Sequence, residues 1–192
     1  VGAGFDDVGV LKFAGDRLAV TVDYTNFRPL GAEFNSSLLA RGYFLIIHNV
    51  SDLIASGAIP LAGVVALGLP STFSKQDVER LGEGIRLAAD ECGVAIMGGD
   101  TKEAPCLALN ATLFGRLGNG GHWSRGAAQP GDSLFLSGQI GATSSAVLAL
   151  NRGVSSPDII EKSQRALDRP QLPLALAEHL RNEGIRVAAI DL

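Results

Sequence analysis

The residues of this sequence best suited to chemistry are aspartates spread along the chain. Asp23, Asp100 and Asp191 each stand at or just beyond the end of a short apolar run. Such runs, rich in branched residues, are typical of strands, so these three carboxylates are expected at strand ends rather than on solvated helix faces. Asp7 lies at the start of another expected strand, and Asp52 lies inside an otherwise apolar helical stretch.

Carboxylates in these positions fit a magnesium-phosphate site. An aspartate inside an apolar helix has to be hydrogen-bonded, paired or bound to a cation. Mg2+ prefers oxygen ligands and is usually held by one or two carboxylates together with substrate phosphates. Gly98 and Gly99, which precede Asp100, would allow backbone N–H groups to come close to a phosphate. Each aspartate alone also fits a turn, a cap or an ion pair, and it is the set that favours the site.

Several other kinds of active site are excluded or disfavoured by the sequence. It contains no GxxxxGK[ST], GxGxxG, HRD, DFG, GxSxG or HExxH motif. Their absence disfavours a P-loop, a protein-kinase site, the nucleophile elbow of α/β-hydrolases and the zinc site of metalloproteases. Cys92 and Cys106 lack metal-ligand spacing and are interpreted as small core residues. His48 is interpreted as a helix residue near the core, His122 as a linker residue and His179 as a solvent-facing helix residue.

Composition argues against two kinds of partner. Sixteen Lys and Arg against twenty Asp and Glu give a formal net charge of −4 without a basic cluster, so nucleic acid is not an expected partner. No apolar run reaches the roughly 18 residues that cross a bilayer, and the N-terminus lacks the pattern of a signal peptide. We therefore expect a cytoplasmic protein without a membrane partner.

The elements that must position the aspartates fall into two groups. In the first group, strands are expected at residues 16–23, 61–69, 94–97 and 107–117, and helices at residues 36–56 and 74–92. The second helix opens with Ser74 and Asp77, an aspartate variant of the capping box. This group forms an expected first domain at residues 1–117.

A Gly-rich segment at residues 118–131 is the expected linker to a second domain at residues 132–192. There, strands are expected at residues 133–137 and 185–190, with helices between them at residues 141–151, 156–167 and 172–182. A unit of about 60 residues is small for an independent core. We therefore expect this second domain to be incomplete.

Four blocks of sequence carry a resemblance to a known family. They are Gly4 to Leu11 (GFDDVGVL), Val22-Asp23, Asn49 to Pro60 (NVSDLIASGAIP) and Gly93 to Thr101 (GVAIMGGDT). With them the chain resembles the thiamine-monophosphate kinase family and its superfamily, which includes aminoimidazole ribonucleotide synthetase, selenophosphate synthetase and a hydrogenase maturation factor. The resemblance continues through residues 124–127, 130–132, 138–141 and 189–192.

The resemblance implies an α/β (α+β) protein. Its mixed-sheet N-terminal domain would be of the aminoimidazole ribonucleotide synthetase type and would form a homodimer, and it would be followed by a partial α+β C-terminal domain. It also implies ATP as co-substrate and several Mg2+ ions. The positions that match metal ligands are Asp7, Thr21, Asp23, Asp52, Asp100 and Asp191, and those that match ATP contacts are Gly99, Asp100 and Arg125. No covalent nucleophile is expected, since such transfer depends on positioning and charge neutralisation.

The acceptor is the part of the expected reaction that the sequence leaves open. The resemblance implies transfer of the γ-phosphoryl group of ATP to a small phosphorylated acceptor, thiamine monophosphate. However, Thr21-Val22-Asp23 lacks one hydroxyl of the family pattern, and Asn26 stands where the family has a His that touches the acceptor. Two alternatives follow: an ATP-using enzyme with a different acceptor, and a nucleotide-binding homologue without catalysis.

Overall fold

The structure, a computed structural model, describes residues 6–25, 36–118, 120–138, 140–141, 145, 148, 152–153 and 156–192. Its centre is a five-stranded sheet with the strand order β1-β2-β5-β3-β4. The strands are β1 (Gly9–Phe13), β2 (Asp16–Thr25), β3 (Ala58–Leu69), β4 (Ala95–Glu103) and β5 (Ala108–Leu117). The helices are α1 (Leu38–Ala55), α2 (Lys75–Cys92), η1 (Arg125–Ala127), α4 (Pro157–Asp168) and α5 (Leu174–Asn182).

The sheet is mixed, as predicted. β3 and β4 are parallel and are joined through α2, whereas β1 with β2, β2 with β5, and β3 with β5 are antiparallel. A parallel pair needs a crossover connection, and the amphipathic α2 supplies it. The predicted capping box is confirmed at its start, where the Ser74 and Asp77 side chains and backbones bond reciprocally.

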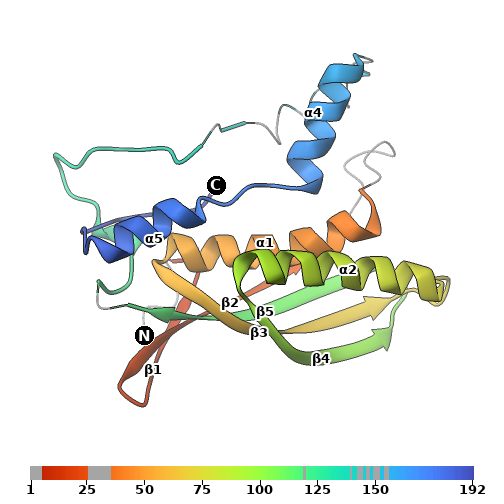
Figure 1. Ribbon diagram of the computed structural model, residues 1–192, viewed down its shortest axis with the longest axis horizontal. Helices are drawn as coiled ribbons and strands as arrows, with labels where there is room; N and C mark the ends of the chain where they lie inside the picture. The colour runs from red at the N-terminus through yellow and green to blue at the C-terminus, as the bar shows by residue number, and fades with distance from the viewer. Residues whose placement is uncertain are drawn as a thin grey trace.

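Helices α1 and α2 cover one face of the sheet (Figure 1). Two glycines bring the helices together: a Cβ on Gly42 would lie 2.1 Å from the Leu81 carbonyl oxygen, and one on Gly84 would lie 1.9 Å from that of Leu39. α1 is long and apolar enough to cross a membrane, but 61% of it is buried in the fold, as expected of a core helix. The opposite face of the sheet is covered by none of the described helices (Figure 1).

The predicted strands and helices of residues 1–117 all occur, with two informative changes of boundary. The strand predicted at residues 94–97 runs on to Glu103, so that Asp100 lies within β4 and not beyond its end. Asp23 likewise lies inside β2, which ends at Thr25. Side chains alternate between the two faces of a strand, so the face on which each aspartate lies decides what it can meet.

In the C-terminal part, α4 and α5 confirm the helices predicted at residues 156–167 and 172–182. The strands predicted at residues 133–137 and 185–190 are wrong, because these segments are irregular. A strand needs a neighbour to pair its backbone groups, and the described residues offer none here. The helix predicted at residues 141–151 lies mostly outside the described residues. The domain boundaries stay predictions.

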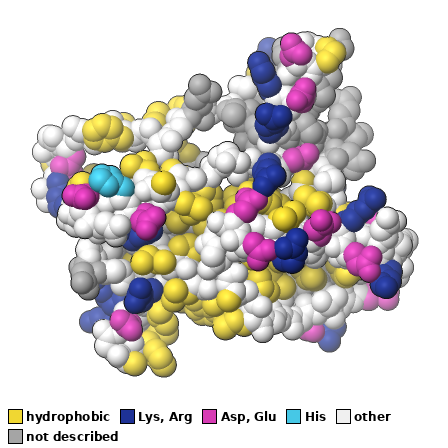
Figure 2. Space-filling view, in the orientation of Figure 1, with side chains coloured by type: hydrophobic (Ala, Val, Ile, Leu, Met, Phe, Trp, Pro, Cys, Tyr) yellow, Lys and Arg dark blue, Asp and Glu magenta, His cyan; other side chains and the backbone are white. Residues whose placement is uncertain are grey.

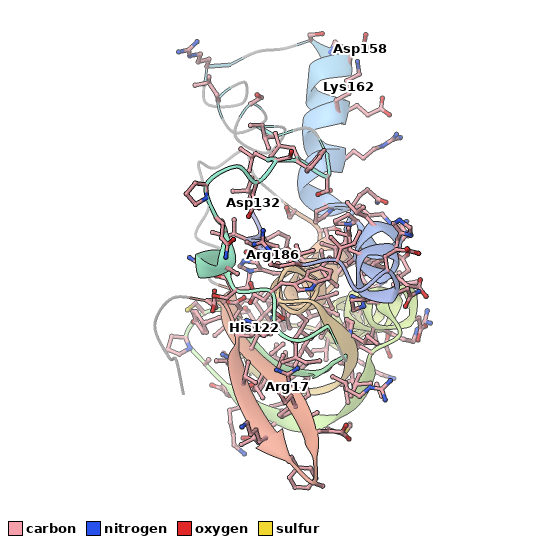
Figure 3. The ribbon with its side chains drawn as sticks, turned by 90° about the vertical axis from the view of Figure 1, so that its left-hand side faces the viewer. Arg17, His122, Asp132, Asp158, Lys162 and Arg186 are labelled. Carbon is pink, nitrogen blue, oxygen red and sulfur yellow. The ribbon has the colours of Figure 1, made fainter. Side chains whose placement is uncertain are left out.

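Side-chain contacts tie this part to the sheet domain. Arg169, at the end of α4, lies over the Tyr43 ring and pairs with Glu91, which also accepts a hydrogen bond from the Tyr43 hydroxyl at 2.7 Å. Arg186 donates to the Ala127 carbonyl oxygen at 2.9 Å and pairs with Asp132, beside it in Figure 3. On the face shown in Figure 2, basic and acidic side chains intermingle along α2 and α4.

Candidate metal and nucleotide site

The core of the site is a hydrogen bond between β2 and α1. Asp52 lies in the last turn of α1, and its Oδ2 accepts a hydrogen bond of 2.5 Å from Thr21 Oγ1 on β2. Both residues are buried, with exposed fractions of 7% and 3%. The helix packs its apolar side on the sheet, so a polar residue on that side has to find a partner. Thr21 is the partner of Asp52. Thr21 was itself predicted as a metal ligand, and in the structure its hydroxyl holds the Asp52 carboxylate in place.

Three carboxylates from distant parts of the chain meet at this point. One carboxylate oxygen each from Asp7, Asp52 and Asp191 lies within 4.8 Å of the others. Asp7 arrives just before β1, Asp52 at the end of α1, and Asp191 on the irregular segment after α5. The structure therefore brings together three of the aspartates that sequence analysis predicted as metal ligands.

Asp23 on β2 lies close enough to Asp52 to affect its pKa, and Asn49 holds the backbone of Asp23 in place. The Asp23 backbone N–H donates to Asn49 Oδ1 at 3.1 Å, and Asn49 Nδ2 donates to the Leu45 carbonyl oxygen at 2.9 Å. Asn49 is fully buried. Sequence analysis included it only as part of a motif, although a buried amide one turn before a buried aspartate needs partners of its own. Its position in an apolar helix was the available signal.

The electrostatics of this cluster favour a cation. The pKa of Asp52 is raised to about 8, chiefly by burial; the negative charges of Asp23 and Asp191 also raise it, while the hydrogen bond from Thr21 lowers it. A bound divalent cation would stabilise the ionised carboxylates that the protein alone disfavours. Clustered carboxylate oxygens are the hard ligands that Mg2+ prefers, so the residues present fit this ion.

Arg125 lies on the edge of the cluster. Its guanidinium Nη2 contacts Asp7 Oδ1 at 2.5 Å. The backbone of Arg125 is held by Asp6, whose carboxylate accepts hydrogen bonds from Arg125 N at 2.9 Å and from Ser124 Oγ at 2.9 and 3.1 Å. These contacts, with Trp123 N bonded to the Ser56 carbonyl oxygen, fix the segment after β5 over the end of α1.

Gly99 and Asp100, which sequence analysis placed in the same site, lie elsewhere in this chain. β4 is separated from β2 by β5 and β3, or by three strand spacings totalling roughly 14 Å. Asp100 is in register with Ala66, which pairs with Asn110 and hence with Tyr24, so it faces away from α1. Its side chain is 67% exposed and pairs with Lys102.

Gly99 has a packing role that sequence analysis missed. A Cβ on this residue would lie 1.8 Å from the Val65 carbonyl oxygen on β3. The close approach of the two strands therefore requires glycine here, whether or not a phosphate also binds. Its predicted contact with ATP stays a prediction.

Asn26, the predicted acceptor contact, lies outside the described residues. His48, interpreted from sequence as a residue near the core, has a side chain that is 44% exposed, with Nδ1 3.9 Å from Asp23 Oδ2. Its ring lies 5.3 Å from that of Phe44, one turn earlier on α1. His48 is therefore not a core residue. Helix α1 reaches the margin of the site, and the side of the helix that carries His48 is open to solvent there.

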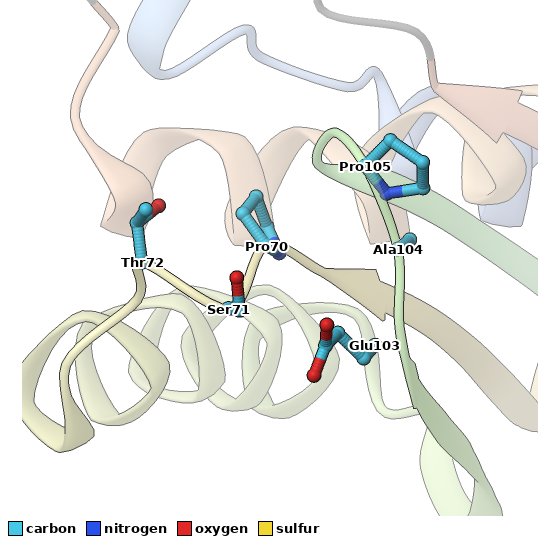
Figure 4. Close-up of a pocket in the computed structure, with 6 residues that line it drawn as sticks. All are labelled: Pro70, Ser71, Thr72, Glu103, Ala104 and Pro105. Carbon is cyan, nitrogen blue, oxygen red and sulfur yellow. The ribbon is translucent and has the colours of Figure 1, made fainter.

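A separate shallow hollow lies at the carboxyl ends of β3 and β4 (Figure 4). It contains none of the aspartates just described. Its lining residues are Pro70, Ser71, Thr72, Glu103, Ala104 and Pro105.

Comparison with known proteins places this arrangement in a family. A family model described as AIR synthase related protein, N-terminal domain, matches residues 5–117. The chain belongs to this family. The matched region of the AIR synthase related domain contains Asp7, Asp23 and Asp52, whereas Arg125 and Asp191 lie outside it.

Curated relatives support the resemblance found in the four sequence blocks. The thiamine-monophosphate kinase of Pyrococcus horikoshii is 31% identical over 176 residues, which cover 91% of this chain and 56% of the relative. The Aquifex aeolicus thiamine-monophosphate kinase is 27% identical over 180 residues, covering 92% and 57%. The resemblance is thus confirmed. The chain spans about half the length of the curated relatives it matches.

Solved structures give the same result. A structure described as AaThiL complexed with AMPPCP and TMP has a TM-score of 0.80 at 26% identity, covering 92% of this chain and 56% of that one. The Escherichia coli hydrogenase maturation protein HypE has a TM-score of 0.66 at 25% identity, covering 87% and 50%. The predicted fold class is confirmed.

Proposed function

We propose that the protein is an ATP-dependent phosphotransferase that transfers the γ-phosphoryl group of Mg-ATP to thiamine monophosphate. The observation that carries the proposal is the meeting of Asp7, Asp52 and Asp191 beside Arg125. In this reaction the bond between the γ-phosphorus and the bridging oxygen of ATP breaks, and a phosphate oxygen of the acceptor forms a new bond to that phosphorus. The products are ADP and thiamine diphosphate.

The aspartates would hold the metal. Asp7, Asp52 and Asp191 offer oxygens to Mg2+, and Asp23 extends the acidic surface beside them. Bound Mg2+ supplies neutralisation of phosphate charge and orientation of the transferred group. Thr21 and Asn49 keep Asp52 and Asp23 in place through the hydrogen bonds described above.

Arg125 would bind the nucleotide phosphates. A guanidinium can donate two parallel hydrogen bonds to phosphate oxygens, and it stays charged at any physiological pH. Without nucleotide it neutralises Asp7 at 2.5 Å. Phosphate and metal together would replace this pair, with Asp7 turning to the metal and Arg125 to the phosphate.

Thiamine monophosphate is proposed as the acceptor because of the relatives. Several of them are named thiamine-monophosphate kinase, and a similar structure is described as a complex with AMPPCP and TMP. An assay with thiamine monophosphate separates this acceptor from the two alternatives raised by the sequence, a different acceptor and a nucleotide-binding homologue without catalysis.

We also propose a homodimer built on the open face of the sheet. Large apolar side chains are exposed on its strands, among them Val22 at 59%, Tyr24 at 55% and Met97 at 64%. A second copy would cover them, and Asp100 lies on the same face. In such a dimer Asp100 could serve the site of the partner copy, which would account for its distance from Asp52. A cytoplasmic location completes the proposal and accords with the metabolic names of the relatives.

The test is an assay of the full-length protein with Mg2+, ATP and thiamine monophosphate. The proposal predicts ADP and thiamine diphosphate in equal amounts, both dependent on Mg2+. Mg2+-dependent binding of AMPPCP, together with no turnover of ATP, would support the non-catalytic alternative. ATP turnover that thiamine monophosphate does not stimulate would show that the acceptor is wrong.

A further inference from the structure

Asp6 contacts a segment of the chain more than a hundred residues away. Its side chain is only 15% exposed, although it neighbours the partly open Asp7. Both of its oxygens are engaged: Oδ1 and Oδ2 accept from the Ser124 hydroxyl at 3.1 and 2.9 Å, and Oδ1 also accepts from the Arg125 backbone N–H at 2.9 Å. The carboxylate thus fixes the first residue of η1.

Two adjacent aspartates therefore hold the same arginine in different ways. Asp6 binds the backbone of Arg125, and Asp7 binds its guanidinium. Phosphate binding would free the guanidinium from Asp7 but would leave the backbone contact of Asp6 unchanged. The start of the Arg125 side chain would then stay in place throughout the binding cycle.

A direct role of Asp6 in metal binding fits the geometry less well. The group of carboxylates that could share an ion contains Asp7, Asp52 and Asp191, and Asp6 is not part of it. Its oxygens are directed to Ser124 and Arg125, with His122 Nε2 3.8 Å away. Figure 3 shows His122 in the segment that leads into η1, below Asp132 and Arg186.

We propose that Asp6 is a positioning residue that orients Arg125 for the nucleotide phosphates. The inference rests on the proposed function, in which Arg125 contacts ATP. An arginine side chain loses much conformational entropy when it is immobilised by a ligand. A backbone that is already fixed before the ligand binds reduces this entropic cost of binding. Removal of the Asp6 carboxylate should therefore weaken nucleotide binding through Arg125 alone.

A double-mutant cycle tests this dependence. Asp6→Ala, Arg125→Ala and the double variant are compared for binding of AMPPCP with Mg2+ by calorimetry, and for KM and kcat in the full-length protein. Asp6→Ala is expected to weaken AMPPCP binding about 5- to 20-fold, chiefly through KM, and to have less than about a twofold effect in the Arg125→Ala background. Asp6→Asn keeps one acceptor oxygen and should recover part of the affinity.

Asp132→Ala is the matched control. Asp132 also accepts a backbone hydrogen bond, from Gln129 N at 2.8 Å, and pairs with an arginine, Arg186, but it is not a member of the group of carboxylates that could share an ion. It should lower the melting temperature as Asp6→Ala does, while leaving AMPPCP affinity unchanged. If Asp6→Ala fails to fold, Ser124→Ala removes one donor to the same carboxylate and should weaken binding two- to threefold or so.

Three results would overturn the inference: unchanged AMPPCP affinity in Asp6→Ala, additive losses in the double variant, or an equal loss in Asp132→Ala. The proposed function is read separately, from the wild-type protein. If the wild type binds AMPPCP but transfers no phosphoryl group from ATP to thiamine monophosphate, the kinase reaction is refuted, while the double-mutant cycle can still be measured by AMPPCP binding. Absence of AMPPCP binding by the wild type would refute both.

Discussion

The two acidic regions of this chain look alike in sequence and differ in structure. Asp52, in a motif block on α1, is buried against β2 and meets Asp7 and Asp191. Asp100, in an equally clear block on β4, is 67% exposed on the other face of the sheet and pairs with Lys102. Both were predicted as ligands of one site. Within a single chain, only the first of them reaches it.

A sequence motif therefore identifies a residue but not the face of the sheet on which its side chain lies. A strand that is extended by a few residues moves Asp100 from a loop into β4, where the alternation of side chains selects the open face. Gly99, next to Asp100, is required because a Cβ there would collide with the backbone of Val65. A Gly-Gly pair that suggests phosphate binding in the sequence therefore also has a packing explanation. Four measurements test the difference between the regions of Asp52 and Asp100.

The largest effect is expected from loss of the buried carboxylate. Asp52→Ala should lower phosphoryl transfer by a factor on the order of 10² to 10⁴, because the metal loses a ligand and Thr21 loses its acceptor. Steady-state kinetics with saturating Mg2+ would measure it. Asp90→Ala is the control, since Asp90 is exposed on α2 and pairs only with Arg86 among the described contacts. Similar activity in both variants would contradict the assignment.

The second prediction asks whether Asp100 acts across a dimer. Asp52→Asn and Asp100→Asn are each expected to be inactive, and refolding an equal mixture should restore about a quarter of wild-type activity. Half of the dimers would then be mixed, and each of these would contain one site with neither substitution. A mixture that remains inactive, although dimers exchange subunits, would show that Asp100 serves the site of its own chain, and an active Asp100→Asn variant would show that Asp100 serves no site.

The third prediction concerns stability and separates packing from phosphate binding at Gly99. Gly99→Ala should lower the free energy of unfolding by about 3 kcal/mol, since the new Cβ would lie 1.8 Å from a backbone oxygen. Gly82→Ala on α2 is the control: nothing lies within 4 Å of its Cβ position. That variant should be stabilised by roughly 0.5–1 kcal/mol. Urea unfolding without nucleotide measures both, and a stable Gly99→Ala would refute the packing role.

The smallest effect is a pH dependence of stability. The folded protein binds the proton of Asp52 more tightly than the unfolded chain does, because its pKa is raised from 3.8 to about 8. Stability without metal should therefore fall as pH rises from about 4 to about 8. Asp52→Asn should remove this loss and be more stable by roughly 1–2 kcal/mol at pH 9, with little difference at pH 4. Equal pH profiles would contradict the raised pKa.

Much of the sheet domain could be predicted from local pattern. The capping box at Ser74, the helical spacing around Asp52 and the apolar runs of β2, β3 and β5 each depend on nearby residues, and all were placed within a few residues. The C-terminal strands failed because a strand depends on a partner that local pattern does not reveal. Leu134, in the first of these segments, is 94% exposed, as expected of an apolar residue whose segment pairs with none of the described strands.

The site was predictable in composition but not in arrangement. Asp7, Asp23, Asp52 and Asp191 could be selected by residue type and motif. The support given by Asn49 and Asp6 could not, since it depends on contacts between β2 and α1 and between the N-terminal segment and Ser124. The face of Asp100 depended on the length of β4, which extends past a Gly-Gly pair that normally suggests a turn.

The most direct test of the account is calorimetric titration of AMPPCP into wild-type protein and Asp191→Asn, each with and without Mg2+. Asp191 lies outside the region that the family model matches, and it belongs to the site because the fold brings it next to Asp7 and Asp52. We expect that AMPPCP binding by the wild type requires Mg2+ and that it is weakened at least about tenfold in Asp191→Asn. Equal affinity in the two proteins, or binding by the wild type that does not need Mg2+, would contradict it.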